Sequence, residues 1–135
     1  MVHCCKDSNI AMTPYSSLAS GRLVRDWTET TKRLNEDTFA KGKYDLTAEK
    51  DKIIVDRVAE IAEKNNMTRI QVALGWLLSK TRSPVVGATK IYHIEEAVKA
   101  VSVKLTDEEM RYLEGPYVPH KLVGVMAQNK YTINI

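Results

Sequence analysis

The residue types in this sequence that are best suited to chemistry are those that bind phosphate, and one group of them lies at residues 85–90. The run Val85-Val86-Gly87-Ala88-Thr89-Lys90 leads directly into a predicted helix that begins near Tyr92. A strand that ends in small residues leaves the N–H groups of the following helix N-terminus free to bind an anion, and the Thr89 hydroxyl and the Lys90 charge would add to them. On spacing alone, an ordinary strand-to-helix turn with a solvated lysine is the simpler interpretation.

A second candidate phosphate site is the run Pro14-Tyr15-Ser16-Ser17-Leu18-Ala19-Ser20-Gly21-Arg22-Leu23. Its hydroxyl groups, the flexible Gly21 and the guanidinium fork of Arg22 suit a pyrophosphate bridge, and the ring of Tyr15 could stack on a flat ligand ring. Small polar residues after a strand usually form only a turn, so composition leaves both interpretations open.

Other kinds of chemistry find little support in the sequence. His3, Cys4 and Cys5 are consecutive, and three consecutive side chains rarely converge on one metal ion, so a frayed helix end is the better interpretation. The two adjacent cysteines cannot easily form a mutual disulfide. A net charge of +3, from 20 basic and 17 acidic residues without a run of one sign, argues poorly for general nucleic-acid binding.

The elements that must position the two phosphate candidates are predicted to be short strands alternating with helices. Residues 9–15 are predicted to form a strand that Pro14 closes, and the continuously apolar run 83–88 is typical of a strand buried on both faces. Residues 16–49 show little periodicity, so we expect a long excursion with one helical turn near Thr30 to Arg33.

Apolar residues at three- and four-residue spacing predict the helices. The first begins near Lys50 and ends at the polar turn 64–66, the second starts with a Thr68–Gln71 capping box, and the last short one starts with a Thr106–Glu109 capping box and runs through Leu113. The predicted buried positions are Ile54, Val58 and Ile61, then Ile70, Ala73, Leu74 and Leu77, and, in the helix after residue 92, Ile94, Ala97, Val98 and Val101.

This order of elements is the βαβα alternation of a parallel α/β fold. We expect one domain over residues 1–118, followed by an irregular tail over residues 119–135. Two strands cannot complete a parallel sheet, because each would keep an edge of unpaired N–H and C=O groups. The sequence therefore predicts a missing partner, which is either a further N-terminal segment or another copy that associates through the open strand edges.

Taken together, these stretches resemble the aldo-keto reductases, most closely the bacterial and fungal branch that includes the aryl-alcohol dehydrogenases. The resemblance covers roughly residues 1–125 and depends on residues 14–23, on Gln71-Val72-Ala73-Leu74-Gly75-Trp76-Leu77-Leu78 and on residues 84–90. It implies a partial (β/α)8 barrel consisting of the last two β/α units and the C-terminal helices. Asn9 to Thr13 would be the seventh strand and Pro84 to Ala88 the eighth, and the loops after these two strands frequently bind phosphate in such barrels.

The resemblance also implies NADP(H) as the cofactor and a role for ten residues. Tyr15 would stack on the nicotinamide, Thr89, Lys90 and His93 would bind the adenosine 2′-phosphate, and Glu96 would lie by the adenine. The residues expected to contact the pyrophosphate bridge are Ser16, Leu18, Ser20, Gly21 and Arg22. His93 stands where many members have arginine, and the loss of a permanent bidentate charge leaves the choice between NADP and NAD open.

The catalytic Asp, Tyr, Lys and His of this family come from the first half of the barrel, and the resemblance places the start of this chain after all four. Hydride transfer to a carbonyl needs an acid to protonate the oxygen, and Tyr15 is not that residue. We therefore expect a fragment of an aldehyde and ketone reductase that is inactive by itself and binds NADP(H) weakly or not at all. A truncated product without function is an equal alternative.

A DNA-binding helix-turn-helix is a further alternative, because Val58 to Leu78 contains two predicted helices around a short polar turn. The second of these helices is apolar on nearly every face, whereas a recognition helix must present polar side chains, so DNA binding is disfavoured. The N-terminus lacks the features of a secretory signal, and no apolar stretch approaches the about 18 to 20 residues that cross a bilayer. A cytoplasmic protein without a membrane partner is the expectation.

Overall fold

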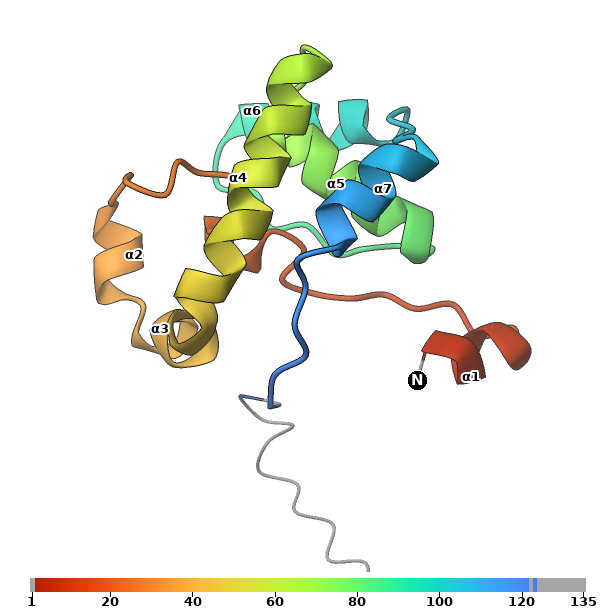
Figure 1. Cartoon of the computed structure of the whole chain (residues 1–135), viewed down its shortest axis with the longest axis horizontal. Coiled ribbons are helices and arrows are strands. Elements are labelled where there is room, and N and C mark those ends of the chain that lie inside the picture. The colour runs from red at the N-terminus through yellow and green to blue at the C-terminus, as the bar shows by residue number, and fades with distance from the viewer. Residues whose placement is uncertain (1, 122, 124–135) are drawn as a thin grey trace, which may run out of the picture.

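The computed structural model describes residues 2–121 and 123, and within them helices are joined by turns and extended segments (Figure 1). In chain order the elements are α1 (Val2–Asp7), the 3-10 turn η1 (Ala19–Gly21), α2 (Lys32–Glu36), α3 (Thr38–Tyr44), the 3-10 turn η2 (Asp45–Thr47), α4 (Ala48–Lys64), α5 (Arg69–Lys80), α6 (Ile91–Ala100) and α7 (Asp107–Glu114). Helix α1 stands apart from the others and buries none of its residues.

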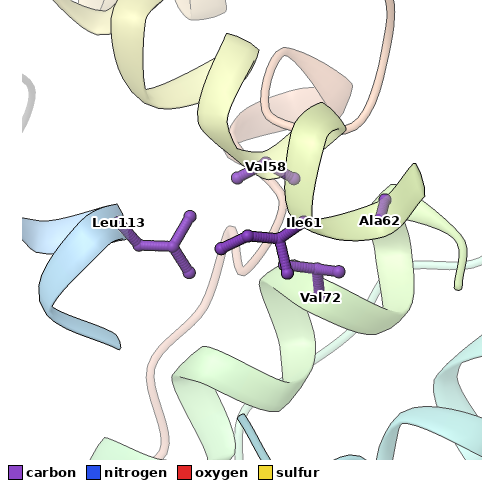
Figure 2. Close-up of a cluster of buried hydrophobic side chains, with 5 residues drawn as sticks. All are labelled: Val58, Ile61, Ala62, Val72 and Leu113. Atoms are coloured by element: carbon purple, nitrogen blue, oxygen red, sulfur yellow. The ribbon is translucent and has the colours of Figure 1, made fainter. Parts of the chain in front are cut away.

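The main core lies where α4, α5 and α7 meet (Figure 2). Its buried side chains are Val58, Ile61 and Ala62 from α4, Val72 from α5 and Leu113 from α7. Burial of such side chains removes apolar surface from water, which is the dominant favourable contribution to folding. The predicted spacing of α4 is confirmed at Val58 and Ile61, which are both buried.

Local signals in the sequence fix where three helices begin. The hydroxyls of Thr68 and Thr106 accept hydrogen bonds from the N–H groups of Gln71 and Glu109, and both capping boxes are complete, as predicted. The Asp37 carboxylate accepts a hydrogen bond from the Ala40 N–H and caps α3 in the same manner. Each cap satisfies a backbone donor that the first turn of the helix leaves unpaired.

Helix α5 lies at the centre of the helical packing, in contact with both α4 and α6. Four consecutive residues, 72–75, are buried, so this part of α5 is covered on all sides. Gly75 permits the close approach of the segment after α6, because a Cβ atom there would lie 2.6 Å from Cγ1 of Val103. An enclosed α5 does not offer the exposed face that a DNA-recognition helix requires.

The predicted α/β fold, a partial (β/α)8 barrel, is wrong for this structure, because the described residues contain helices and no strands. Residues 9–15 and 84–88 are non-helical, as expected, but they form no ladder. One backbone hydrogen bond joins them, from the Val85 N–H to the Pro14 carbonyl at 2.8 Å. Pro14 has no N–H to donate in return, and a strand depends on repeated pairing with its neighbours.

The predicted excursion over residues 16–49 is more ordered than expected. The single predicted helical turn near Thr30 to Arg33 overlaps only the start of α2. Helix α3 follows α2 at once, η1 precedes this pair of helices and η2 follows it. These short helices lack a repeated apolar pattern, and Ala40 is the buried residue of α3. The predicted tail, residues 119–135, lies mostly outside the described residues, and the domain boundary at residue 118 stays a prediction.

Candidate functional site

The 14–23 loop and the 85–90 loop, named by their residue numbers, lie next to each other at their N-terminal ends. The carbonyl of Val85 accepts a hydrogen bond from Oγ of Ser17 at 2.7 Å, and the N–H of Val85 donates to the carbonyl of Pro14. Both backbone polar groups of Val85 are thus bonded to the other loop. The structure therefore brings together two stretches that are 68 residues apart in the sequence and that were predicted separately to bind phosphate.

The 14–23 loop has an unusual backbone. Ser16, Ala19, Ser20 and Gly21 all have positive φ angles, of 58, 49, 57 and 89°. Such angles are uncommon for residues other than glycine, and each one turns the peptide groups away from a regular helix or strand. The guanidinium of Arg25 packs closely over Gly21, because a Cβ atom there would lie 2.9 Å from Cζ of Arg25 and the arginine would have to move.

Tyr15 and Arg22 lie at opposite ends of this loop and differ in their availability. The Tyr15 side chain is 69% exposed, and Nζ of Lys43 lies 4.7 Å from the centre of its ring. Arg22 instead donates from Nε and Nη2 to Oδ1 of Asp45, at 3.2 and 2.8 Å, and stacks over Tyr44. Tyr15 is thus largely exposed but has a lysine over its ring, whereas Arg22 is held by a carboxylate.

In the 85–90 loop, the predicted phosphate ligands Thr89 and Lys90 are exposed at the start of α6. The N–H of Thr89 donates to Nδ1 of His93 at 3.3 Å, and the His93 ring packs edge-on against Tyr92. Nζ of Lys90 lies 5.8 Å from the centre of the Tyr92 ring. A phosphate would therefore compete with His93 for the Thr89 N–H, while the Lys90 ammonium remains accessible.

Glu96 lies on the side of α6 that faces α5, with 9% of the residue exposed. Its carboxylate accepts hydrogen bonds from Nζ of Lys99 at 2.8 Å and from Oγ1 of Thr68 at 2.5 Å. The bond from Lys99 and then the bond from Thr68 lower the pKa of Glu96, because both stabilise the charged form. Both carboxylate oxygens are thus bonded within the protein, and the predicted contact to adenine is not tested by this geometry.

Some contacts around the two loops were not foreseen from the sequence. Asp45, which holds Arg22, and Lys43, which covers Tyr15, both come from the stretch predicted to be an irregular excursion. Arg25, which packs over Gly21, follows Arg22 by three residues. The two arginines that follow Gly21 were visible in the sequence, but the positions of Lys43 and Asp45 depend on α3 and η2, which show no periodic apolar pattern.

None of the helices in the described part of the chain has the length and apolar character needed to cross a membrane.

Comparison with known proteins gives a consistent result. Residues 1–117 match the sequence model of the Aldo/keto reductase family. The chain is 43% identical over 123 residues to the versiconal hemiacetal acetate reductase of Aspergillus parasiticus. The aligned region covers 88% of this chain and 36% of that protein. An aldo-keto reductase of Fusarium vanettenii is 35% identical over 125 residues, covering 92% of this chain and 34% of the relative.

A protein of Saccharomyces cerevisiae whose name assigns it to the aryl-alcohol dehydrogenases is 34% identical over 117 residues, covering 86% of this chain and 34% of the relative. The chain thus spans 34 to 36% of the length of these three relatives. The match to the family model includes the 14–23 loop, α5 and the 85–90 loop, on which the resemblance depended. The resemblance is therefore confirmed, including its aryl-alcohol dehydrogenase-like members, and the chain belongs to the aldo/keto reductase family.

Proposed function

We propose that this chain supplies the part of an NADP(H)-dependent oxidoreductase that holds the phosphates of the cofactor. The observation that carries the proposal is the pairing of the 14–23 loop with the 85–90 loop through both backbone groups of Val85. Loops with free hydroxyls, backbone N–H groups and a lysine are suited to phosphate, and two of them side by side suit a ligand with several phosphates. Membership of the family supports a dinucleotide as that ligand.

In the proposed complex, each loop has its own task. Tyr15 stacks on the nicotinamide, and the pyrophosphate lies along the 14–23 loop at Ser16, Leu18, Ser20, Gly21 and Arg22. Thr89, Lys90 and His93 take the 2′-phosphate, with Glu96 on the side of the adenine. His93 would have to release the Thr89 N–H, and Arg22 would share its guanidinium between Asp45 and the pyrophosphate.

The chemistry that this site serves is proposed to be hydride transfer between NADPH and an aldehyde or ketone. The relatives support a carbonyl substrate, since one is named as a hemiacetal acetate reductase and another as an aryl-alcohol dehydrogenase. Protonation of the carbonyl oxygen requires an acid at the reacting centre. We assign no residue of this chain to that role, so the groups that complete the reaction would have to come from other polypeptide.

Cofactor binding can be tested by titrating the 135-residue chain with NADPH and NADH in a calorimeter. Lys90→Ala should weaken NADPH binding by about tenfold, because it removes one charge-assisted hydrogen bond to phosphate, and should leave NADH binding nearly unchanged. Lys104→Ala is the matched control, since it removes an exposed lysine away from both loops. An NADPH titration that Lys90→Ala does not alter would contradict the phosphate assignment.

Turnover provides a separate test. The chain alone is expected to show no loss of absorbance at the NADPH band when it is mixed with NADPH and 4-nitrobenzaldehyde, because we assign the role of proton donor to the carbonyl oxygen to no residue of the described chain. Steady consumption of NADPH that depends on the aldehyde would show that the reacting groups are present after all.

A further inference from the structure

A pocket of about 340 Å³ lies behind the 14–23 loop, between η1, the segment that follows it, and the α3 to α4 region. Its volume falls within the range of about 300–1,000 Å³ that is usual for small-ligand sites. Of the ten residues predicted to bind the cofactor, only Arg22 lines this pocket. The pocket is therefore a separate feature of the fold and not the surface on which Tyr15, Thr89 and Lys90 are exposed.

The walls of the pocket combine apolar and charged side chains. Apolar and aromatic surface comes from Leu23, Trp27, Tyr44 and Ile54. The charged side chains of the lining are the cations Arg22, Arg25 and Lys41 and the carboxylates Asp26, Glu29, Asp45 and Asp51. A pocket with flat apolar walls and a few polar groups is suited to a small organic molecule that carries one charged group. The identity of that group depends on which charges in the lining are already paired.

Both arginines carry a nitrogen that lacks a partner. Nη1 of Arg22 and Nη1 of Arg25 are buried, and neither forms a hydrogen bond. Arg22 has partners for its other two nitrogens at Asp45, whereas Arg25 forms no ion pair within residues 2–121. A buried donor without an acceptor is unfavourable, and few such groups persist in folded proteins without a functional reason.

Most of the carboxylates that line the pocket already accept hydrogen bonds or form ion pairs with other residues of the protein. Asp26 accepts hydrogen bonds from Thr28 and pairs with Arg69, and Asp51 accepts one from Thr47. Glu29 also lines the pocket, but within the described chain it forms no ion pair with Arg25. Among the described residues, the lining side chains that form no ion pair and no hydrogen bond to another side chain include two cations, Arg25 and Lys41, and one carboxylate, Glu29, so the unpaired charge of the pocket is positive.

We propose that this pocket binds a small organic anion, consisting of an aromatic or apolar body with one phosphate or carboxylate group, and that Arg25 is its principal ligand. Nη1 of Arg25 now packs against the bare Cα of Gly21. Because Nη1 forms no hydrogen bond there, turning it toward a bound oxyanion would break none. The Trp27 and Tyr44 rings would flank the body of the ligand. The site goes beyond the proposed dinucleotide site and does not depend on it.

The full chain should be titrated with phenyl phosphate, benzoate, inorganic phosphate and phenol, with the heat of binding and the indole N–H signal of Trp27 as readouts. Phenyl phosphate or benzoate should bind at least tenfold more tightly than phenol, which lacks the anionic group, and than inorganic phosphate, which lacks the apolar body. Whichever of phenyl phosphate and benzoate binds more tightly identifies the group as phosphate or carboxylate. Phenol binding as tight as that of phenyl phosphate and benzoate would overturn the proposal.

Two variants locate the charge. Arg25→Met keeps an unbranched side chain but removes the guanidinium and should weaken binding of the preferred anion at least fivefold, whereas Arg25→Lys should retain part of it. Arg111→Met, at an exposed residue of α7 that does not line the pocket, makes the same change in net charge and should have no effect. Far-UV circular dichroism verifies that each variant is folded. Equal weakening by Arg25→Met and Arg111→Met would overturn the role of Arg25.

The same titrations separate this site from the dinucleotide site. Lys90→Ala, which should weaken NADPH binding, should leave the titration with phenyl phosphate or benzoate unchanged. Saturating NADP+ should not displace the bound anion. Displacement by NADP+ together with a loss of anion binding in Lys90→Ala would overturn the separate pocket, while a failure of NADPH to bind would affect the dinucleotide site alone.

Discussion

At the scale of single residues, Gly21 is a position where the backbone favours glycine. Its φ of 89° is one that L side chains rarely adopt, and its Cα lies directly under the guanidinium of Arg25. Ser16, Ala19 and Ser20 also have positive φ angles, so the 14–23 loop holds several peptides in orientations that cost conformational free energy. The loop keeps this shape through contacts made elsewhere, such as the bond from Ser17 to Val85.

Gly21→Ala is therefore expected to destabilise the fold by about 1–2 kcal/mol, the usual cost of a left-handed conformation for a residue with a Cβ atom. Gly42→Ala is the matched control, because Gly42 lies inside α3 with no atom within 4 Å of the added methyl group, and it should stabilise the chain by about 0.5–1 kcal/mol. Urea unfolding monitored by circular dichroism measures both. Equal effects of the same sign would contradict the backbone described for Gly21.

Residue types alone identified the two loops but not the state of each side chain. The family resemblance implied that Arg22 and Glu96 contact the cofactor, and the structure shows both in bonds within the protein, to Asp45 and to Thr68 and Lys99. These partners come from other elements, and pairing over such distances in the chain cannot be derived from local spacing. The cofactor contacts of all ten residues stay predictions.

At the scale of elements, the helix starts were the most predictable features. Thr68 with Gln71 and Thr106 with Glu109 are short-range signals that depend only on residues three apart, and the structure confirms both. Strands depend on partners instead. Residues 84–88 have the continuous apolar pattern of a buried strand, but the described chain supplies them with one backbone bond, so the pattern did not become a strand.

Glu109 links two elements and makes the stability of the fold dependent on pH. Its carboxylate accepts hydrogen bonds from Nδ2 of Asn65, at the end of α4, and from the Thr106 N–H. The bond from Asn65, followed by that from Thr106, lowers the pKa of Glu109 below its usual value of 4.5. The unfolded chain therefore binds a proton at a higher pH than the folded chain, so stability is present above about pH 4.5 and is lost as the pH falls through the lower folded pKa.

Glu109→Gln should consequently lower the free energy of unfolding by about 1–2 kcal/mol at pH 7 and by less at pH 3, because at pH 3 this carboxyl is already protonated in the unfolded chain. Glu108→Gln, on the exposed side of the same first turn, should have a much smaller effect at both values. Urea unfolding at a series of pH values compares the three proteins. A Glu109→Gln effect that is the same at pH 3 and pH 7 would rule out the charge as its cause.

At the scale of the whole molecule, most of the apolar side chains of α6 that were predicted to be buried are exposed. Ile94, Val98 and Val101 were predicted to be buried, and they are exposed, while Glu96 and Ala100 face α5. The periodicity correctly predicted a helix with one apolar face, but it could not predict which face would find a neighbour. The described chain covers the opposite face, so apolar burial is concentrated in the contacts among α4, α5 and α7.

The two valines of α5 and α6 allow this distribution to be measured with one chemical change. Val72 is 0% exposed and Val98 is 65% exposed, and both lie inside helices. Val72→Ala should lower the free energy of unfolding by about 2 kcal/mol, because it removes two buried methyl groups and leaves a cavity. Val98→Ala should change it by less than about 0.5 kcal/mol, since little contact is lost and alanine favours the helix. The opposite result would be a loss of unfolding free energy in Val98→Ala as large as in Val72→Ala, and larger still at high protein concentration. A second copy would then cover α6 in solution, and the exposed apolar residues Ile94, Val98 and Val101 would not be exposed in the associated protein.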